Sequence, residues 1–217
     1  MSIEIVDFIQ KHKVITICRR LYGQDLLNLV RALHQGGINM VEVTFDQSDP
    51  DCINKTAEAI RMLVENFGSS MKIGAGTVLT KEQVRATKDA GGSYIISPNV
   101  DVEIIKYTKE LGLVSIPGAM TPSEILTAHN TGADFVKLFP AGNLGFDYIK
   151  NIMAPISHVK LIATGGVTEE ILPEYLKLGF AGAGIGGRLT DRKLITTGEF
   201  ETFTERAKGF SKVVMEY

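Results

Sequence analysis

Asp134-Phe135-Val136-Lys137-Leu138-Phe139-Pro140 is one of eight short apolar segments whose repetition decides the fold of this chain. Its β-branched and aromatic residues, and the proline at its end, are typical of a buried strand. Because strand side chains alternate, Phe135, Lys137 and Phe139 are expected on one face, with Val136 and Leu138 on the other. The pattern therefore predicts a strand that carries a lysine between two aromatic rings.

Similar strands alternate with amphipathic helical segments along the whole chain. The predicted strands cover residues 13–18, 39–44, 72–76, 93–97, 112–116, 134–139, 159–163 and 181–185. A helix through Ile5, Phe8 and Ile9 precedes them, and Thr80-x-x-Gln83 and Thr121-Pro122-Ser123-Glu124 are typical of helix starts. Eight strand–helix units predict a (β/α)8 TIM barrel with an N-terminal helix, formed as a single domain by residues 1–217.

The same alternation is also compatible with an open doubly wound sheet. That fold is disfavoured because no GxGxxG motif follows the first strand and eight units fill the chain. A glycine-rich segment, Gly182-Ala183-Gly184-Ile185-Gly186-Gly187, does follow the last strand. It lacks the helix and the acidic residue of a dinucleotide motif, so its glycines need another explanation.

Composition excludes several classes of function. The formal net charge of -2 provides no basic field for nucleic acid or an anionic membrane. The acidic N-terminal segment and the lack of a membrane-length apolar run favour a cytoplasmic protein. Cys18 and Cys52 are expected to be free thiols, and the four histidines are scattered without metal-ligand spacing. We therefore expect a small-molecule ligand and no metal or other cofactor.

Two charged residues within predicted strands are candidates for catalysis. Burial would lower the pKa of the Lys137 amine, and such amines form Schiff bases with carbonyl compounds. Glu42, in Met40-Val41-Glu42-Val43-Thr44, is a carboxylate among apolar neighbours that could exchange a proton near neutral pH. Each also has a structural alternative. Lys137 could extend its ammonium to solvent or pair with a carboxylate, and Glu42 could be a buried counter-ion.

Two glycine-rich loops indicate an anion site. Thr164-Gly165-Gly166-Val167-Thr168 and Gly184-Ile185-Gly186-Gly187-Arg188 follow the seventh and eighth strands, where barrels commonly bind phosphate. Glycines let backbone N–H groups approach an anion closely, a helix N-terminus would add favourable charge, and Arg188 could add a bidentate contact. The alternative is that these glycines only form tight turns. Arg19, Arg20 and Thr77 also end predicted strands, at the catalytic face of a barrel.

Six motifs, taken in order, resemble those of the 2-keto-3-deoxy-6-phosphogluconate / 4-hydroxy-2-oxoglutarate aldolases. They are Val41-Glu42-Val43-Thr44, Gly74-Ala75-Gly76-Thr77-Val78, Ile96-Ser97-Pro98, Ile116-Pro117-Gly118-Ala119-Met120-Thr121-Pro122, Lys137-Leu138-Phe139-Pro140 and Thr164-Gly165-Gly166. The resemblance covers nearly the whole chain. It implies a class I aldolase, a carbon–carbon lyase of Entner–Doudoroff carbohydrate metabolism, that is usually a homotrimer and needs no metal.

The resemblance also implies a role for each site residue. Lys137 matches the Schiff-base lysine and Glu42 the general acid/base, while Thr77 matches a threonine that helps hold the pyruvate carboxylate. Matches to the pocket lining are Pro98, Phe139 and Thr164, and matches to the phosphate-binding region are Gly165, Gly166, Gly187 and Arg188. The implied reaction is cleavage of a 2-keto-3-deoxy acid sugar, first of all 2-keto-3-deoxy-6-phosphogluconate, to pyruvate and glyceraldehyde 3-phosphate.

Two departures from the family pattern leave the substrate open. Many members place an arginine shortly after Glu-Val-Thr to grip the substrate carboxylate, and Asp46 stands at that point. Other members, including the phosphogalactonate aldolases, supply it from the end of the first strand, which assigns carboxylate binding to Arg19, with Arg20 as second candidate. Arg188 replaces a serine of many relatives and could bind phosphate or a second carboxylate.

Two other functions also remain open at this stage. A phosphate-binding isomerase or epimerase would use the same glycine loops, with Glu42 as its base and Lys137 as an electrostatic partner. A non-catalytic binding barrel would keep the pocket without turnover, and Asp46 is the residue that favours it.

Overall fold

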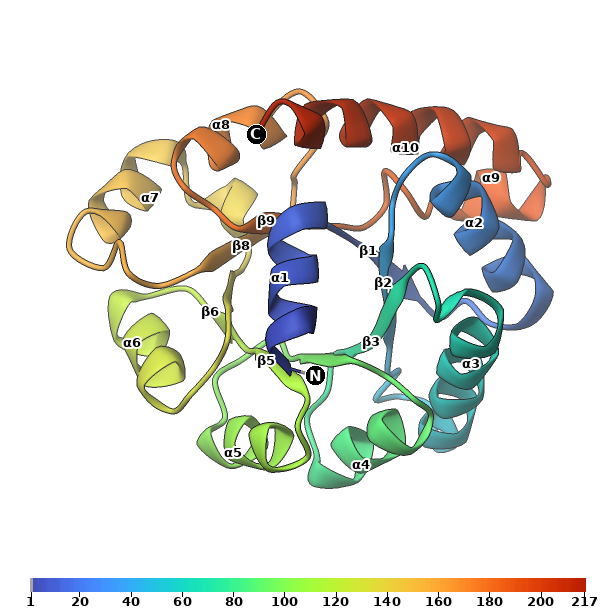
Figure 1. Cartoon of the computed structure of the whole chain (residues 1–217), viewed down its shortest axis with the longest axis horizontal. Coiled ribbons are helices and arrows are strands. Elements are labelled where there is room, and N and C mark those ends of the chain that lie inside the picture. The colour runs from blue at the N-terminus through green and yellow to red at the C-terminus, as the bar shows by residue number, and fades with distance from the viewer. Residues whose placement is uncertain (1) are drawn as a thin grey trace.

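The computed structural model describes residues 2–217 as a barrel of parallel strands surrounded by helices (Figure 1). The strands are β1 (Val14–Arg19), β2 (Met40–Thr44), β3 (Lys72–Gly76), β4 (Tyr94–Ile96), β5 (Val114–Ile116), β6 (Gly118–Ala119), β7 (Val136–Leu138), β8 (Leu161–Thr164) and β9 (Gly182–Ile185). Their order in the sheet is β5-β4-β3-β2-β1-β9-β8-β7-β6. This arrangement confirms the predicted barrel and rules out the open doubly wound sheet.

The fifth predicted strand, residues 112–116, is observed as β5, and an additional short strand, β6, follows it. β5 pairs with β4 through Tyr94↔Val114, and β6 pairs with β7 through Gly118↔Lys137. Pro117 lies between them, and a proline has no N–H group to donate to a strand ladder. Its carbonyl accepts the Lys137 N–H at 2.9 Å instead. The described chain therefore forms nine strands in place of the predicted eight.

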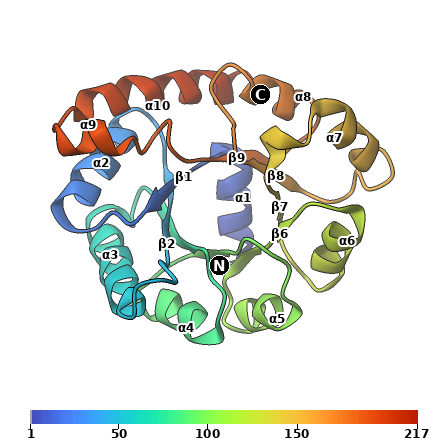
Figure 2. The same cartoon turned by 180° about the vertical axis from the view of Figure 1, so that it is seen from behind.

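The helices lie outside the barrel, except for the first, which covers one end (Figures 1 and 2). They are α1 (Ser2–His12), α2 (Gly23–Gln35), α3 (Cys52–Phe67), α4 (Lys81–Asp89), α5 (Val102–Glu110), α6 (Pro122–Asn130), the 3-10 turn η1 (Ala141–Asn143), α7 (Phe146–Met153), α8 (Leu172–Lys177), α9 (Arg192–Thr196) and α10 (Phe200–Met215). Both predicted helix starts are present. The Thr80 hydroxyl accepts the Gln83 N–H at 3.2 Å, and Thr121 and Glu124 form a capping box.

None of these helices, within residues 2–217, is long and apolar enough to cross a membrane.

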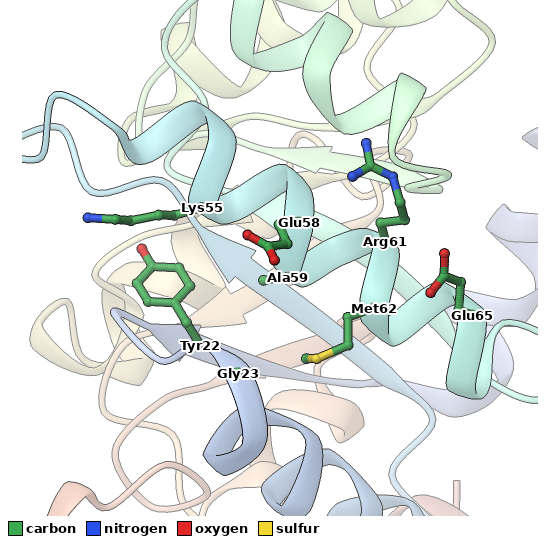
Figure 3. A pocket seen from close by; sticks show the side chains of 8 residues that line it. All are labelled: Tyr22, Gly23, Lys55, Glu58, Ala59, Arg61, Met62 and Glu65. Atoms are coloured by element: carbon green, nitrogen blue, oxygen red, sulfur yellow. The ribbon is translucent and has the colours of Figure 1, made fainter.

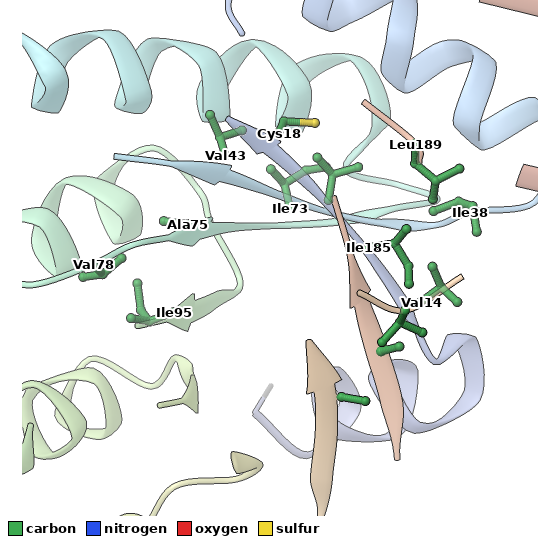
Figure 4. Close-up of a cluster of buried hydrophobic side chains, with 14 of the residues drawn as sticks. Val14, Cys18, Ile38, Val43, Ile73, Ala75, Val78, Ile95, Ile185 and Leu189 are labelled. Atoms are coloured by element: carbon green, nitrogen blue, oxygen red, sulfur yellow. The ribbon is translucent and has the colours of Figure 1, made fainter. Parts of the chain in front are cut away.

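The main apolar core lies between the barrel and its helices (Figure 4). Outward-facing strand residues such as Val14, Val43 and Ile73 contribute to it, as does Cys18. Both cysteines are free, as predicted, and both are buried. A second core fills the barrel interior, with Ile15, Met40, Tyr94, Phe135 and Ile162, and with Ile5 and Ile9 of α1. Because α1 and this second core close the N-terminal end of the barrel, a site can open only at the C-terminal ends of the strands.

Candidate active site

A cavity of about 470 Å³ opens at the C-terminal ends of the strands. All the residues predicted for the site line it, namely Arg19, Glu42, Thr77, Pro98, Lys137, Phe139, Thr164, Gly165, Gly166, Gly187 and Arg188. Val167, Thr168, Gly184 and Gly186, which belong to the two glycine-rich loops predicted to bind an anion, also line the cavity, whereas Ile17 and Thr190 were not predicted. The rule that parallel strands end together at one face would have found Thr190, which closely follows the last strand.

Lys137 lies in the middle of β7, and only 9% of its surface is exposed. Burial lowers the pKa of its amine, the charge of Arg19 adds to this, and the charge of Glu42 opposes it. The Nζ atom lies over the Phe139 ring, 4.9 Å from its centroid. Phe135, the other predicted neighbour, packs in the interior core with the Lys160 amine over its ring. This environment favours a neutral, nucleophilic amine.

Glu42 occupies the inward face of β2 and is 2% exposed. Burial raises the pKa of its carboxyl group, while the charges of Lys137 and Arg19 act in the opposite direction. Within residues 2–217, no nitrogen–oxygen contact of 4.0 Å or less joins Glu42 to Lys137. The two groups therefore influence each other through the cavity without forming a closed salt bridge.

Gly76 on the neighbouring strand makes room for the Glu42 carboxylate. The two strands pair in register, with Glu42 opposite Gly74 and Thr44 opposite Gly76. A Cβ atom at Gly76 would lie 2.7 Å from Cδ of Glu42. Any side chain at this position would therefore displace the carboxylate.

The two arginines at the end of β1 have different surroundings. Arg19 is the last residue of the strand and lines the cavity. Arg20 follows it with a φ of 53° and pairs with Asp46, at 2.7 Å between Nε and Oδ2. Hydrogen bonds from Ser48 and Arg20 lower the pKa of Asp46. Asp46 thus neutralises Arg20 beside the cavity and leaves Arg19 as the arginine that can reach a ligand.

Thr77 directly follows β3, in a conformation that is unusual for a β-branched residue. Its φ of 54° is in the left-handed region, and such outliers cluster at functional sites. Its carbonyl accepts a hydrogen bond from Nε2 of Gln47 at 2.7 Å, and Gln83 supports Gln47 through a second bond at 3.0 Å. These two glutamines fix the loop that presents Thr77 to the cavity.

The loop after β8 offers unpaired backbone donors to the distal part of the cavity. Gly165 and Gly166 have φ values of 94° and 75°, which only glycine adopts without strain. Their N–H groups donate no hydrogen bond to the part of the chain that the structure describes. α8 begins only at Leu172, so an anion here would meet loop amides and not the helix N-terminus that we predicted.

Arg188 is already engaged by an acidic residue. Its Nη2 and Nε atoms donate to the Glu169 carboxylate, with the shortest distance 2.6 Å. Arg188 lies in the loop after β9 and Glu169 in the loop after β8. This pairing was not predicted, because nothing in a local pattern indicates that two loop residues 19 positions apart will meet.

A second hollow, of about 560 Å³, lies outside the barrel between the start of α2 and α3 (Figure 3). Its lining residues are Tyr22, Gly23, Lys55, Glu58, Ala59, Arg61, Met62 and Glu65. The charged ones are exposed, and Lys55 pairs with Asp49 at 2.7 Å. Because none of its charged groups is buried, this hollow lacks the environment that changes the reactivity of an amine or carboxylate.

Comparisons with known proteins show the family to which the chain belongs. The family model described as KDPG and KHG aldolase matches residues 5–205. The 2-dehydro-3-deoxy-6-phosphogalactonate aldolase of Escherichia coli (strain K12) is 34% identical over 180 residues, which are 82% of this chain and 85% of that protein. The 2-dehydro-3-deoxy-phosphogluconate aldolase of Treponema pallidum (strain Nichols) is 30% identical over 213 residues, 98% of each protein.

A solved structure shows the same fold. It is the KDPG aldolase from Legionella pneumophila with pyruvate captured at low pH as a covalent carbinolamine intermediate. The TM-score is 0.83, the identity 28%, and the match covers 94% of this chain and 97% of that chain. The chain therefore belongs to the KDPG and KHG aldolase family and is a carbon–carbon lyase.

Proposed function

We propose that this protein is a class I aldolase in which Lys137 forms a Schiff base with a 2-keto-3-deoxy acid sugar. The observation that carries this proposal is the burial of the Lys137 amine in the cavity, with a lowered pKa and no direct counter-ion in the described chain. An amine attacks a ketone only when it is unprotonated, and this environment favours that state. The carbinolamine captured in the Legionella pneumophila enzyme supports the same chemistry.

The reaction follows from the two buried groups. Lys137 attacks the C2 ketone and water leaves, which gives an iminium ion. Glu42, acting through a water molecule, removes the proton of the C4 hydroxyl, and the C3–C4 bond breaks as its electrons move to the iminium nitrogen. An aldehyde and an enamine result. Protonation of the enamine at C3 and hydrolysis of the imine then release pyruvate and restore Lys137.

The remaining residues bind the two ends of the substrate. Arg19 and Thr77 hold the carboxylate of the pyruvate portion, and Pro98, Phe139 and Thr164 line the pocket around C2 and C3. The distal phosphate binds at Gly165, Gly166, Gly187 and Arg188. This arrangement suits 2-keto-3-deoxy-6-phosphogluconate, whose cleavage yields pyruvate and glyceraldehyde 3-phosphate.

A second candidate substrate is 2-keto-3-deoxy-6-phosphogalactonate. Arg19 at the end of β1, with Asp46 in place of the later arginine, favours it, because the phosphogalactonate aldolases resemble this chain at that point. The Escherichia coli relative that is 34% identical carries that activity in its name. The proposal also includes a single class I aldolase barrel domain over residues 1–217, a homotrimer and a cytoplasmic location.

Borohydride trapping with pyruvate tests the proposal against an isomerase, an epimerase and a non-catalytic barrel. We expect a mass increase that corresponds to a reduced pyruvyl adduct on Lys137. Lys137→Arg should still fold but give no adduct and no pyruvate release, because arginine stays protonated and cannot form the imine. Lys160→Arg is the matched control, since Lys160 also lies over an aromatic ring but is exposed. Absence of an adduct on Lys137 in the native protein would contradict the proposal.

A further inference from the structure

The pair formed by Glu169 and Arg188 lies at the distal part of the cavity. Nε of Arg188 donates to both carboxylate oxygens of Glu169 at 3.0 Å, and Nη2 donates to Oε1 at 2.6 Å. Glu169 thus occupies one complete edge of the guanidinium group, in the bidentate geometry that arginine uses for carboxylates and phosphates. The Glu169 side chain is only 19% exposed, so solvent weakens this contact less than it weakens a fully exposed pair.

This contact changes the charge that a distal anion would meet. With the Nε–Nη2 edge held by Glu169, a phosphate could bind Arg188 through two oxygens only at the Nη1–Nη2 edge, beside the Glu169 carboxylate. The other cations lining the cavity in the described chain are Arg19 and Lys137, which we assign to the pyruvate end. Glu170 adds a second negative charge close to Arg188. The distal part therefore offers free loop amides but no unpaired cation.

We propose that Glu169 is a specificity-determining residue that competes with the phosphate of the substrate for Arg188. This inference rests on the proposed function. A phosphorylated acid sugar must either displace Glu169 or share the charge of Arg188 with it, and in both cases the phosphate dianion lies near the Glu169 carboxylate. An acid sugar with a free terminal hydroxyl avoids this repulsion. Glu169 therefore reduces the preference of the enzyme for phosphorylated over unphosphorylated substrates.

The kinetic test is Glu169→Gln, which keeps the shape of the side chain and removes its charge. We expect kcat/KM for 2-keto-3-deoxy-6-phosphogluconate to rise about tenfold, the effect of removing one competing charge-assisted contact, and kcat/KM for 2-keto-3-deoxygluconate to stay unchanged. Adding Arg188→Ala should abolish the gain. Glu174→Gln is the matched control, because Glu174 lies in α8 nearby and pairs with Lys177 at 2.9 Å on the surface.

A binding measurement separates this inference from the aldolase reaction. Titration calorimetry with inorganic phosphate should show about tenfold tighter binding to Glu169→Gln than to the native protein, and this gain should disappear in the double variant. If no variant cleaves an acid sugar while phosphate binding changes in this way, the proposed function fails and the competition between Glu169 and phosphate stands. Weaker phosphate binding by Glu169→Gln would overturn the inference, because it would show that Glu169 orients Arg188 for phosphate.

Discussion

The two ends of the barrel interior carry opposite kinds of side chain. At the N-terminal end, Met40 of β2 and Phe135, which directly precedes β7, are fully buried in an apolar core. One inward position further along, the same segments carry Glu42 and Lys137, which are also buried but can be charged. Burial of apolar groups stabilises a fold, whereas burial of charges costs stability. The N-terminal end therefore stabilises the barrel, whereas the C-terminal end carries the groups that we propose for catalysis.

β3 leaves space for neighbouring side chains at both ends of the barrel interior, because Gly74 and Gly76 face inward. A Cβ atom at Gly74 would overlap the ring of Tyr94, whose hydroxyl donates to the Val41 carbonyl at 2.7 Å. A Cβ atom at Gly76 would overlap the carboxylate of Glu42. Because glycine has no side chain, Gly74 leaves room for the Tyr94 ring at the N-terminal end of the interior, and Gly76 leaves room for the Glu42 carboxylate at the C-terminal end.

The comparison predicts that Glu42→Gln will impair catalysis far more than folding. Turnover should fall roughly 10²–10⁴-fold, because an amide cannot accept the C4 hydroxyl proton. The rate of pyruvate release and borohydride trapping should be measured together, and the adduct on Lys137 should still form.

The matched control for Glu42→Gln lies on the same face of the same strand. Met40→Leu conserves volume at the N-terminal end of the interior, so it should cost less than about 1.5 kcal/mol and leave turnover unchanged. If Glu42→Gln released pyruvate at the native rate, Glu42 would be a structural counter-ion and not a catalytic group.

Periodicity was sufficient to predict most of this architecture. Every strand in the predicted set begins and ends within two residues of an observed strand, apart from the added β6. The candidate site followed from one rule, that parallel strands end at the same face, and this rule placed Glu42, Thr77 and Lys137 together. Strand alternation also indicated which residues point into the barrel, because that pattern is local.

Features that depend on distant parts of the chain were not predicted. Pro117 was visible in a motif, yet the additional strand β6 exists because the residues after Pro117 pair with β7, whereas β5 pairs with β4. The engagement of Arg188 by Glu169, and of Arg20 by Asp46, depends on how separate loops meet. Such pairs arise from the assembled barrel, and no local pattern encodes them.

Arg19 and Arg20, at the end of β1, provide a second test of the C-terminal end of the barrel. Arg19→Ala should lower kcat/KM about 10–150-fold for every 2-keto acid substrate, which corresponds to roughly 1.5–3 kcal/mol for one charge-assisted contact. It should also weaken inhibition by pyruvate, since pyruvate shares the same carboxylate. Arg20→Ala is the control, because Asp46 already holds Arg20 outside the cavity, and it should leave these constants near native. Equal losses in both variants would contradict the assignment of the carboxylate to Arg19.

The smallest expected effect concerns the stability of the C-terminal end of the interior. The double variant Glu42→Gln Lys137→Met should be inactive but more stable than the native protein by roughly 1–2 kcal/mol at neutral pH, because replacing buried charges with neutral groups of similar size often stabilises a fold. Urea unfolding followed by fluorescence or circular dichroism measures this difference.

The pH dependence of that gain has a definite sign. The pKa of Glu42 is raised in the folded protein, so its contribution to stability is present below the ordinary glutamate pKa and is lost as the pH rises through the folded value. The pKa of Lys137 is lowered, so its contribution is present above the ordinary lysine pKa and is lost as the pH falls through the folded value. The advantage of the double variant should therefore grow as the pH rises from the ordinary glutamate pKa to the folded value of Glu42, and shrink as the pH rises from the folded value of Lys137 towards the ordinary lysine pKa. A double variant less stable than the native protein throughout this range would show that attraction between Glu42 and Lys137 outweighs their desolvation, and the two ends of the barrel would then both stabilise the fold.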